Sequence, residues 1–174
     1  KLANPRYAYI APTYKQAKLI VWDYVKPYTK MIPGVNYNEA ELRCDLPNGA
    51  KIRLLGADNP DSVRGIYLDG VIFDEVAMMQ PKIWSEVVRP LLEDRQGWAI
   101  FIGTPKGHNF FFDLYERAKA QDTWFSASFK ASETGIFTQE QLASIRADGM
   151  SDEEFDQEFE CSFEAAIVGA YYGK

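Results

Sequence analysis

The chain has 174 residues, a length typical of one domain with a sizeable core. Hydrophobic residues make up 47% and charged residues 25%, which indicates a globular protein and excludes a disordered or collagen-like chain. The net charge of −6 argues against a strongly basic nucleic-acid-binding domain, although it leaves room for a local basic face.

Cysteine and histidine are too few for a disulfide framework or a zinc site. The chain contains Cys44, Cys161 and one histidine, His108, and it has no CxxC pair. We therefore expect two reduced, mostly buried thiols. No apolar run approaches the ~18 residues that cross a membrane, so we expect no membrane association.

The N-terminal segment predicts a strand followed by a helix. Residues 7–11 are rich in β-forming side chains and stop at Pro12, which favours a strand. Thr13 is a candidate N-cap, and Pro27 is expected to end or kink the helix that follows. One face of this helix is expected to carry apolar residues at helical spacing: Ala17, Ile20, Val21 and Tyr24.

A hairpin and a buried strand are predicted next. Residues 41–46 and 50–55 flank Asn48-Gly49, a strong hairpin signal because both positions tolerate a positive φ. After a polar loop, residues 67–73 form a nearly continuous apolar run, as in a strand buried on both faces of a parallel sheet. Asp74 and Glu75 follow that run directly.

Helices and strands alternate in the rest of the chain. Helices are predicted over residues 83–92, 110–120, 138–147 and 151–159, and strands over residues 98–102 and 123–129. The order predicts a three-layer α/β domain with a mostly parallel sheet and an inserted β-hairpin. In such sheets chemistry gathers at the carboxyl ends of the strands, where Asp74, Glu75 and the segment 103–107 are expected.

The Asp74-Glu75 pair carries the strongest chemical signal. Successive side chains on a strand point to opposite sides, so the two carboxylates would have different roles. One could hold Mg²⁺, and the other could orient and deprotonate a water that attacks a γ-phosphate. The alternative is a pair of solvated acids at a strand end.

Two further motifs have both a functional and a structural interpretation. Gly103 and Thr104 could sense a γ-phosphate at a strand tip, or could form a plain turn. Arg64 precedes Gly65 and could stabilise charge on a transferring phosphoryl group, or could pair on the surface with Asp58 or Asp61.

Other polar residues are weaker candidates. Thr13, Lys15, Gln16 and Lys18 could contact a phosphate backbone, although a solvated first helical turn is the favoured interpretation. Lys106 and His108 could contact DNA or nucleotide. The aromatic residues Trp84, Trp98, 110–112 and Trp124 are expected in the core rather than in a base-stacking platform.

Several motifs taken together resemble one family. The strings are YIAPTYKQAK, SVRG, VIFDE, FIGTPKG and EFECSFEAAIVGAYYG. They are similar to the ATPase domain of tailed-phage terminase large subunits, from about Arg6 to the last residue. The resemblance implies a P-loop NTPase fold of the ASCE, RecA-like type.

The resemblance also implies roles for individual residues. Asp74 would correspond to the Walker-B aspartate that holds Mg²⁺, and Glu75 to the catalytic glutamate. Gly103 and Thr104 would form the coupling motif at the bound ATP. Arg64 resembles the family's arginine finger, which would act on the nucleotide of a neighbouring subunit.

The chain departs from the family pattern because it contains no GxxxxGK[ST], the sequence that cradles nucleotide phosphates. We therefore expect residues 1–164 to be an ATPase domain that is incomplete at its N-terminus, and residues 165–174 to begin a linker toward a nuclease domain. The isolated chain is expected to hydrolyse ATP poorly or not at all.

The family's function supplies the remaining expectations. A phage or prophage motor of this kind would couple ATP hydrolysis to translocation of double-stranded DNA into a capsid, in the cytoplasm of the bacterial host. It would form a homo-oligomeric ring and bind the portal protein and the small terminase subunit. The alternatives are a helicase-like DNA-dependent ATPase and a non-catalytic NTPase-like interaction domain.

Overall fold

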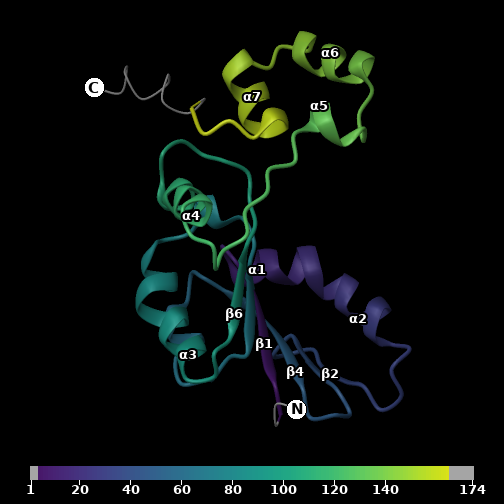
Figure 1. The fold of residues 1–174 in the computed structure, drawn as a ribbon. Coiled ribbons are helices and arrows are strands. Elements are labelled where there is room, and N and C mark those ends of the chain that lie inside the picture. Colours follow the sequence, from purple (N-terminus) through teal and green to yellow (C-terminus); the bar gives the residue numbers. More distant parts are fainter. Residues whose placement is uncertain (1–3, 165–174) are drawn as a thin grey trace. The chain divides into compact units, whose positions relative to one another are not determined.

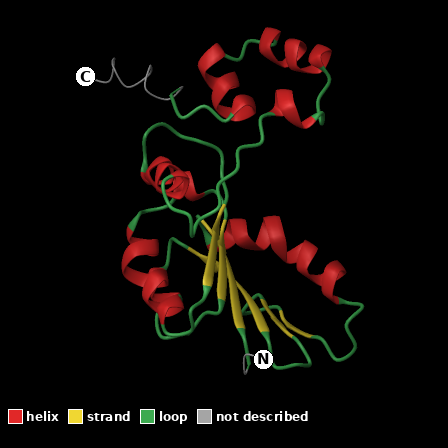
Figure 2. Cartoon of the chain, viewed as in Figure 1, coloured by secondary structure: helices red, strands yellow, loops and turns green. Residues whose placement is uncertain are grey.

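The computed structural model describes residues 4–164 of the chain. The chain groups into two compact units, residues 1–103 and 104–174 (Figure 1). The first unit contains a six-stranded sheet, and the described part of the second unit is helical (Figure 2). The expected linker, residues 165–174, lies outside the described residues.

The sheet of the first unit has the strand order β2-β3-β4-β1-β5-β6. The strands are β1 (Arg6–Ala11), β2 (Asn36–Asn38), β3 (Arg43–Asp45), β4 (Lys51–Gly56), β5 (Gly70–Phe73) and β6 (Trp98–Phe101). Strands β4, β1, β5 and β6 are parallel, and β2 and β3 pair in antiparallel fashion. The predicted α/β class with a mostly parallel sheet is therefore confirmed.

Helices cover both faces of this sheet (Figure 1). One side carries a continuous helical stretch made of α1 (Tyr14–Ala17), a π-helical turn η1 (Lys18–Trp22) and α2 (Asp23–Thr29). The other side carries a second π-helical turn, η4 (Ile83–Val88), and α3 (Arg89–Glu93). Short 3₁₀ turns are formed by η2 (Pro60–Ser62) and η3 (Val76–Met78). The three-layer arrangement follows from this alternation of strands and helices.

The first helical stretch begins as predicted, but of its predicted apolar face only Ala17 and Val21 pack in the core. The Thr13 side chain accepts a hydrogen bond from the Gln16 N–H, which confirms Thr13 as the N-cap. The core cluster on this side consists of Ala11, Ala17, Trp22, Leu42 and Leu54. Ile20 and Tyr24, which were expected to be buried, are 39% and 61% exposed. The π-helical turn explains the difference, because its wider winding interrupts the period of 3.6 residues.

The opposite face of the sheet is packed with aromatic residues. The Phe73 ring stacks on Phe101 with centroids 5.2 Å apart, and Trp84 meets both rings edge-on. Val87 and Val88 of η4 are also buried. Burial of this kind is the main favourable contribution to folding, and it anchors the carboxyl end of β5.

The hairpin between β3 and β4 is confirmed with one difference in its turn. The Leu46 carbonyl accepts from the Gly49 N–H, and Gly49 has a φ of +84°. Asn48 does not share the positive φ that the sequence motif predicted. The geometry fits a three-residue hairpin loop, in which only the last position is left-handed.

Strand β6 is more exposed than a fully apolar strand predicts. It is the last strand in the sheet order, and Trp98, Ile100 and Ile102 are 46%, 45% and 50% exposed. The expectation that Trp98 belongs to the core is therefore wrong. An edge position explains the difference, because the strand has a neighbour on only one side.

A buried carboxylate joins the amino ends of three strands. The Asp69 side chain is 1% exposed, and its two oxygens accept hydrogen bonds from the Arg6 N–H and the Arg95 Nε–H, both at 2.7 Å. Arg95 also lies over the Tyr67 ring, 4.4 Å from its centroid. These contacts fix the starts of β1, β5 and β6 relative to one another.

The described part of the second unit contains four helices. They are α4 (Phe110–Lys119), α5 (Ala131–Thr134), α6 (Gln139–Ala147) and α7 (Asp152–Glu160). The strand predicted over residues 123–129 does not form, and Phe125 and Phe129 are 88% and 75% exposed. A strand needs a neighbour for its backbone hydrogen bonds, and no strand occurs among residues 104–164.

None of the helices in the described part of the chain has the length and apolar character that crossing a membrane requires.

Candidate functional site

The candidate site lies at the carboxyl end of β5, where Asp74 and Glu75 follow the buried strand. The Asp74 N–H donates to the Ile10 carbonyl of β1 at 2.9 Å, so the two central parallel strands end together. Both carboxylate residues are neither fully buried nor fully exposed. The predicted position at the carboxyl edge of a parallel sheet is thereby confirmed, as in other open α/β sheets.

Glu75 has an unusual backbone conformation that points the chain away from the strand. Its φ is +57°, in the left-handed region that non-glycine residues rarely adopt. The Val76 N–H then donates to the Ile102 carbonyl at 3.1 Å, which ties this turn to the end of β6. Such outliers persist where surrounding structure holds them, and they concentrate at functional sites.

Gly103 packs directly against the Glu75 turn. A Cβ atom at Gly103 would lie 3.1 Å from the Val76 nitrogen and 3.4 Å from the Glu75 Cα. Both neighbours are backbone atoms, which yield less easily than the end of a flexible side chain. The structure therefore brings Gly103 next to Glu75, and it explains why a residue without a side chain stands there.

The Asp74 carboxylate is held by two hydrogen bonds. The Tyr9 hydroxyl of β1 donates to Oδ2, and the Glu75 N–H donates to Oδ1 at 3.1 Å. Burial, together with the nearby carboxylates of Asp74 and Glu75, raises the pKa of the Tyr9 phenol well above its usual value. The phenol therefore stays protonated at neutral pH and acts as the donor to Asp74.

The donor set suits a magnesium ion that is shared with phosphates. Mg²⁺ prefers carboxylate oxygens, and it is usually held by one or two carboxylates plus substrate phosphates and water. Asp74 offers an oriented carboxylate with lone pairs left after its two hydrogen bonds. Among residues 4–164, no three His, Cys, Asp or Glu side chains gather to form a metal cage of their own.

Arg64 is placed on the surface and pairs locally. Its Nε lies 3.1 Å from the Asp61 Oδ1, and the two side chains are 59% and 90% exposed. Gly65 follows with a φ of +79° and has open space around it. In the structure Arg64 thus pairs on the surface with Asp61, which was the structural interpretation of this residue. It forms no ion pair with the Asp74 carboxylate. An exposed pair of this kind is weak, so Arg64 can exchange partners readily.

The start of α1 is occupied by protein groups. The Tyr14 N–H donates to the Asp58 carboxylate at 3.2 Å, alongside the Thr13 cap. Lys15, Gln16 and Lys18 are exposed. This first turn therefore matches the solvated helix start that the sequence left open as an alternative to phosphate contact.

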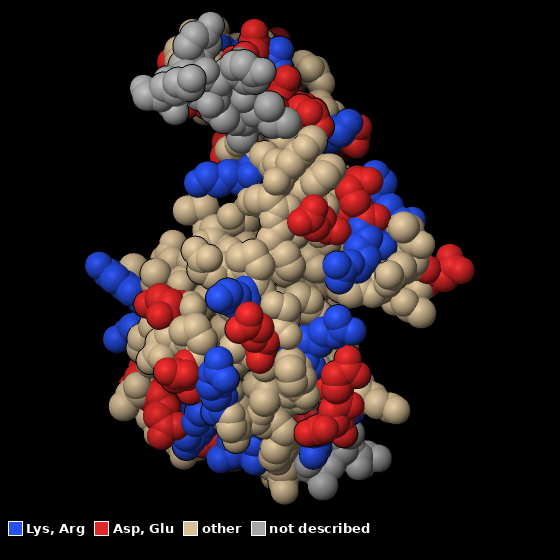
Figure 3. All heavy atoms as spheres, turned by 90° about the vertical axis from the view of Figure 1, so that its left-hand side faces the viewer, with Lys and Arg blue, Asp and Glu red and all other residues tan. Residues whose placement is uncertain are grey.

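Thr104 is the next residue after Gly103 and opens the second unit. Within that unit, the His108 Nε2 lies 2.7 Å from the Glu164 Oε1, and the His108 ring stacks on Phe112 with centroids 4.1 Å apart. These contacts give His108 a structural explanation. On the face drawn in Figure 3, Lys and Arg side chains are interspersed with Asp and Glu rather than gathered into one basic patch.

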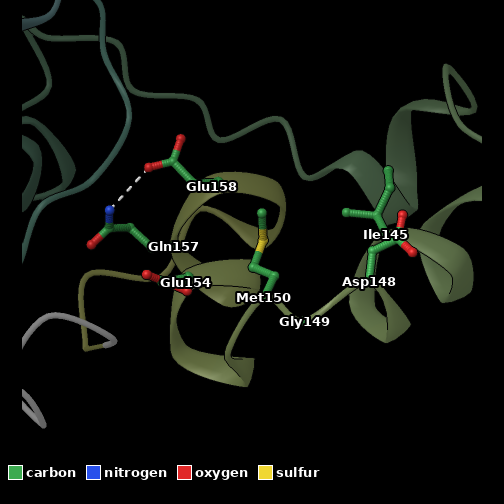
Figure 4. Close-up of a pocket in the computed structure, with 7 residues that line it drawn as sticks. All are labelled: Ile145, Asp148, Gly149, Met150, Glu154, Gln157 and Glu158. Atoms are coloured by element: carbon green, nitrogen blue, oxygen red, sulfur yellow. Dashed lines mark hydrogen bonds between the residues drawn. The ribbon is translucent and has the colours of Figure 1, made fainter.

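The helical unit has an open pocket of about 540 Å³ (Figure 4). It is lined by Ile145, Asp148, Gly149, Met150, Glu154, Gln157 and Glu158. The Gln157 amide donates to the Glu158 carboxylate at 3.0 Å, and Glu154 is engaged in the capping box of α7. Because its lining carries carboxylates and no cation, the pocket does not suit a triphosphate.

Sequence reasoning missed Tyr9 as a member of the site. Tyr9 looks like one more β-forming residue in its strand, and its partner Asp74 is 65 positions away. Only the register between β1 and β5 brings them together, with Tyr9 opposite Ile72. The available signal was a polar-tipped side chain in a strand that was expected in the same sheet as the Asp74 strand.

Terminase large subunits are found among curated proteins that are similar to this chain. The large subunit of Thermus virus P23-45 is 40% identical over 125 residues, which cover 61% of this chain and 26% of that relative. The large subunit of Escherichia phage T5 is 30% identical over 116 residues, with coverage of 64% and 26%. The chain thus spans about a quarter of the length of these relatives.

Solved structures of large terminases have the same fold. The large terminase ATPase domain of Thermus phage P74-26 matches with a TM-score of 0.70 at 28% identity, covering 92% of this chain and 77% of that one. A large terminase from a thermophilic bacteriophage, in complex with ADP, matches with a TM-score of 0.71 at 16% identity, covering 94% and 42%. A further structure of this second terminase is a complex with ATP-gamma-S.

The comparison with protein-family models points to the same family as these relatives. The family model described as "Terminase large subunit, T4likevirus-type, N-terminal" matches residues 2–172. Since this match spans nearly the whole sequence, the chain belongs to the terminase large subunit family, in its N-terminal region.

Proposed function

We propose that this chain is the ATPase part of a viral DNA-packaging motor. The observation that carries the proposal is the pair Asp74 and Glu75 at the carboxyl edge of a parallel sheet, with Gly103 packed against it. Membership of the terminase family supports this function over the helicase-like alternative. The ADP and ATP-gamma-S complexes of a structurally similar large terminase support ATP as the ligand class.

We assign different roles to the two carboxylates. Asp74 would hold Mg²⁺ through its oriented carboxylate, and the ion would neutralise developing charge on the phosphates when bound. Glu75 would orient the attacking water and accept its proton. The left-handed backbone of Glu75 turns the chain away from the direction of β5. The side chains of Asp74 and Glu75 therefore differ in orientation.

Gly103 and Thr104 would couple the state of the nucleotide to the second unit. Gly103 contacts the Glu75 turn, and Thr104 is covalently next to it at the start of that unit. A change at Glu75 would therefore reach the beginning of residues 104–174 through one backbone contact. Arg64 would serve as an arginine finger for a neighbouring subunit, which its exposure allows.

The remaining parts of the proposal follow from the family. The motor would be a homo-oligomeric ring that translocates double-stranded DNA and works with a portal protein and a small terminase subunit, in the cytoplasm of a bacterial host. Residues 1–164 would form the ATPase part and residues 165–174 would begin a linker. The 174 residues contain no GxxxxGK[ST], so we expect this chain by itself to turn over ATP poorly.

The test uses a large subunit that includes this sequence. We expect Glu75→Gln to lower kcat for ATP hydrolysis by about 100-fold or more, because the amide cannot accept the proton from water. Nucleotide binding should change little, since the substitution preserves size. Steady-state phosphate release and the affinity for a fluorescent ATP analogue measure the two effects separately.

Glu86→Gln is the matched control, because Glu86 is an exposed glutamate on η4. It should leave both quantities unchanged. Equal kcat values for Glu75→Gln and the wild type would remove Glu75 from the reaction and with it the proposed site.

A further inference from the structure

We propose that Tyr9 is a positioning residue that orients the Asp74 carboxylate for a divalent cation. The inference rests on the proposed function, since it takes Asp74 as the magnesium ligand. It adds a residue on a different strand, and it assigns the phenol hydroxyl a specific task.

The sheet register explains how Tyr9 reaches Asp74. Tyr9 of β1 lies opposite Ile72 of the parallel strand β5. Asp74 follows Ile72 by two positions, so the side chains of Asp74 and Ile72 lie on the same side of the sheet as that of Tyr9. The length of the tyrosine side chain spans the remaining offset along the strand, and its hydroxyl donates to the Asp74 Oδ2.

The tyrosine ring is itself held in place. Tyr9 packs against the core cluster under α1 and α2, which includes Ala11, Trp22 and Leu54. A donor on a packed aromatic ring has little rotational freedom, whereas an aspartate at a strand end can rotate about two side-chain bonds. Because the core fixes the ring, its hydroxyl holds the Asp74 carboxylate in one orientation.

The second oxygen of Asp74 is fixed by a local contact. The Glu75 N–H donates to Oδ1 at 3.1 Å. One bond per oxygen defines the plane of the carboxylate and leaves further lone pairs for a cation. Groups that orient a ligand in this way strengthen metal binding without touching the metal.

The experiment measures Mn²⁺ binding to a large subunit that includes this sequence, in the presence of ATP-gamma-S, by electron paramagnetic resonance, with Mn²⁺ as a probe for Mg²⁺. We expect Tyr9→Phe to weaken Mn²⁺ binding by about tenfold, the lower end of the range for lost orienting partners. Phenylalanine keeps the ring in the core and removes only the hydroxyl. Crystal structures should show the Asp74 side chain in more than one rotamer in this variant.

Tyr7→Phe is the matched control, because Tyr7 lies on the same strand and its ring packs beside Trp98. It should bind Mn²⁺ as the wild type does. Melting temperatures of both variants distinguish a loss of folding from a loss of binding. In an Asp74→Asn background, Tyr9→Phe should have no further effect, because the group that it orients is gone.

Four results would overturn the inference. Wild-type affinity in Tyr9→Phe, or an unchanged single Asp74 rotamer, would show that the hydroxyl does not position the carboxylate while leaving the proposed function intact. Unchanged Mn²⁺ binding in Asp74→Asn, or none in the wild type, would instead remove Asp74 as the metal ligand, and the inference would fall with it.

Discussion

At the scale of single residues, the site depends on backbone contacts as much as on its carboxylates. Glu75 occupies a left-handed conformation, and the end of β6 holds it there through the Val76 N–H and the Ile102 carbonyl. Gly103 leaves room for this arrangement because it has no Cβ. The geometry of Glu75 is thus set by a residue that takes no part in chemistry.

Gly103→Ala tests this dependence. The added Cβ would lie 3.1 Å from the Val76 nitrogen, so the Glu75 turn must shift by a few tenths of an ångström. We expect a loss of about 1–3 kcal/mol in the free energy of unfolding, as for other overpacked sites. Urea denaturation of the chain measures it.

The substitution Gly135→Ala is an instructive comparison, since Gly135 has open space around it but a φ of +69°. It should destabilise through backbone strain alone. If Gly103→Ala leaves both stability and the Glu75 turn unchanged, then the close approach has no structural role.

The sequence alone located the acidic pair correctly, because the residues that carry the chemistry directly follow the strand that positions them. The apolar run before Asp74 and Glu75 marked the strand end correctly, because a strand buried on both faces leaves an unbroken signal. It could not find Tyr9, because that role arises from a hydrogen bond between two strands. The register that creates such a bond is a property of the folded sheet.

At the scale of elements, the antiparallel hairpin β3–β4 is held by charged side chains. Asp45 forms ion pairs with Arg43 at 3.0 Å and with Lys51 at 3.3 Å, and Glu41 pairs with Arg53 at 2.9 Å. Cross-strand pairs of opposite charge stabilise a sheet at its solvated side. This hairpin therefore has a stability that depends on pH.

The pH dependence has a definite sign. Burial raises the pKa of Asp45, but hydrogen bonds from Arg43 and Lys51 outweigh it and bring the pKa below its usual value. The contribution of Asp45 is then present above the ordinary aspartate pKa of about 4, and it is lost as the pH falls through the lower folded value.

We expect Asp45→Asn to flatten the loss of stability on acidification in that range, as measured by urea denaturation at a series of pH values. Asp23→Asn, at an exposed position on α2, should keep the wild-type curve. Superimposable curves for Asp45→Asn and the wild type would show that the Asp45 pairs contribute nothing.

Element predictions failed where the environment decides the outcome. Residues 123–129 have the composition of a strand, yet they form none because the described part of their unit offers no strand as a partner. Ile20 and Tyr24 follow a helical period, yet the π-helical turn moves them away from the core. Local propensity sets a preference, and tertiary contacts can override it.

At the scale of the whole molecule, the proposed function predicts cooperation between copies of the chain. Arg64 is exposed and only locally paired, while Asp74 and Glu75 lie at the carboxyl edge of the sheet. An arginine finger that acts in trans fits this placement, because the guanidinium is available to another subunit.

Mixed rings test this arrangement in a large subunit that includes the sequence. Arg64→Ala and Glu75→Gln should each abolish most hydrolysis when alone. Mixing the two variants should restore part of it, because some interfaces then combine an intact Arg64 with an intact Glu75. Phosphate release from mixtures of varied ratio measures the recovery, and its absence would assign Arg64 a role within its own subunit or in the structure.

The open edge of strand β6 also affects how the protein behaves in solution. The outer edge of β6 has no neighbour among the described strands, and Trp98, Ile100 and Ile102 present apolar surface beside it. Backbone groups left open along such a border readily accept a foreign strand. Concentrated solutions of this polypeptide should therefore be prone to intermolecular β-pairing and precipitation, and a chaperone or solubilising fusion would be the natural remedy during purification.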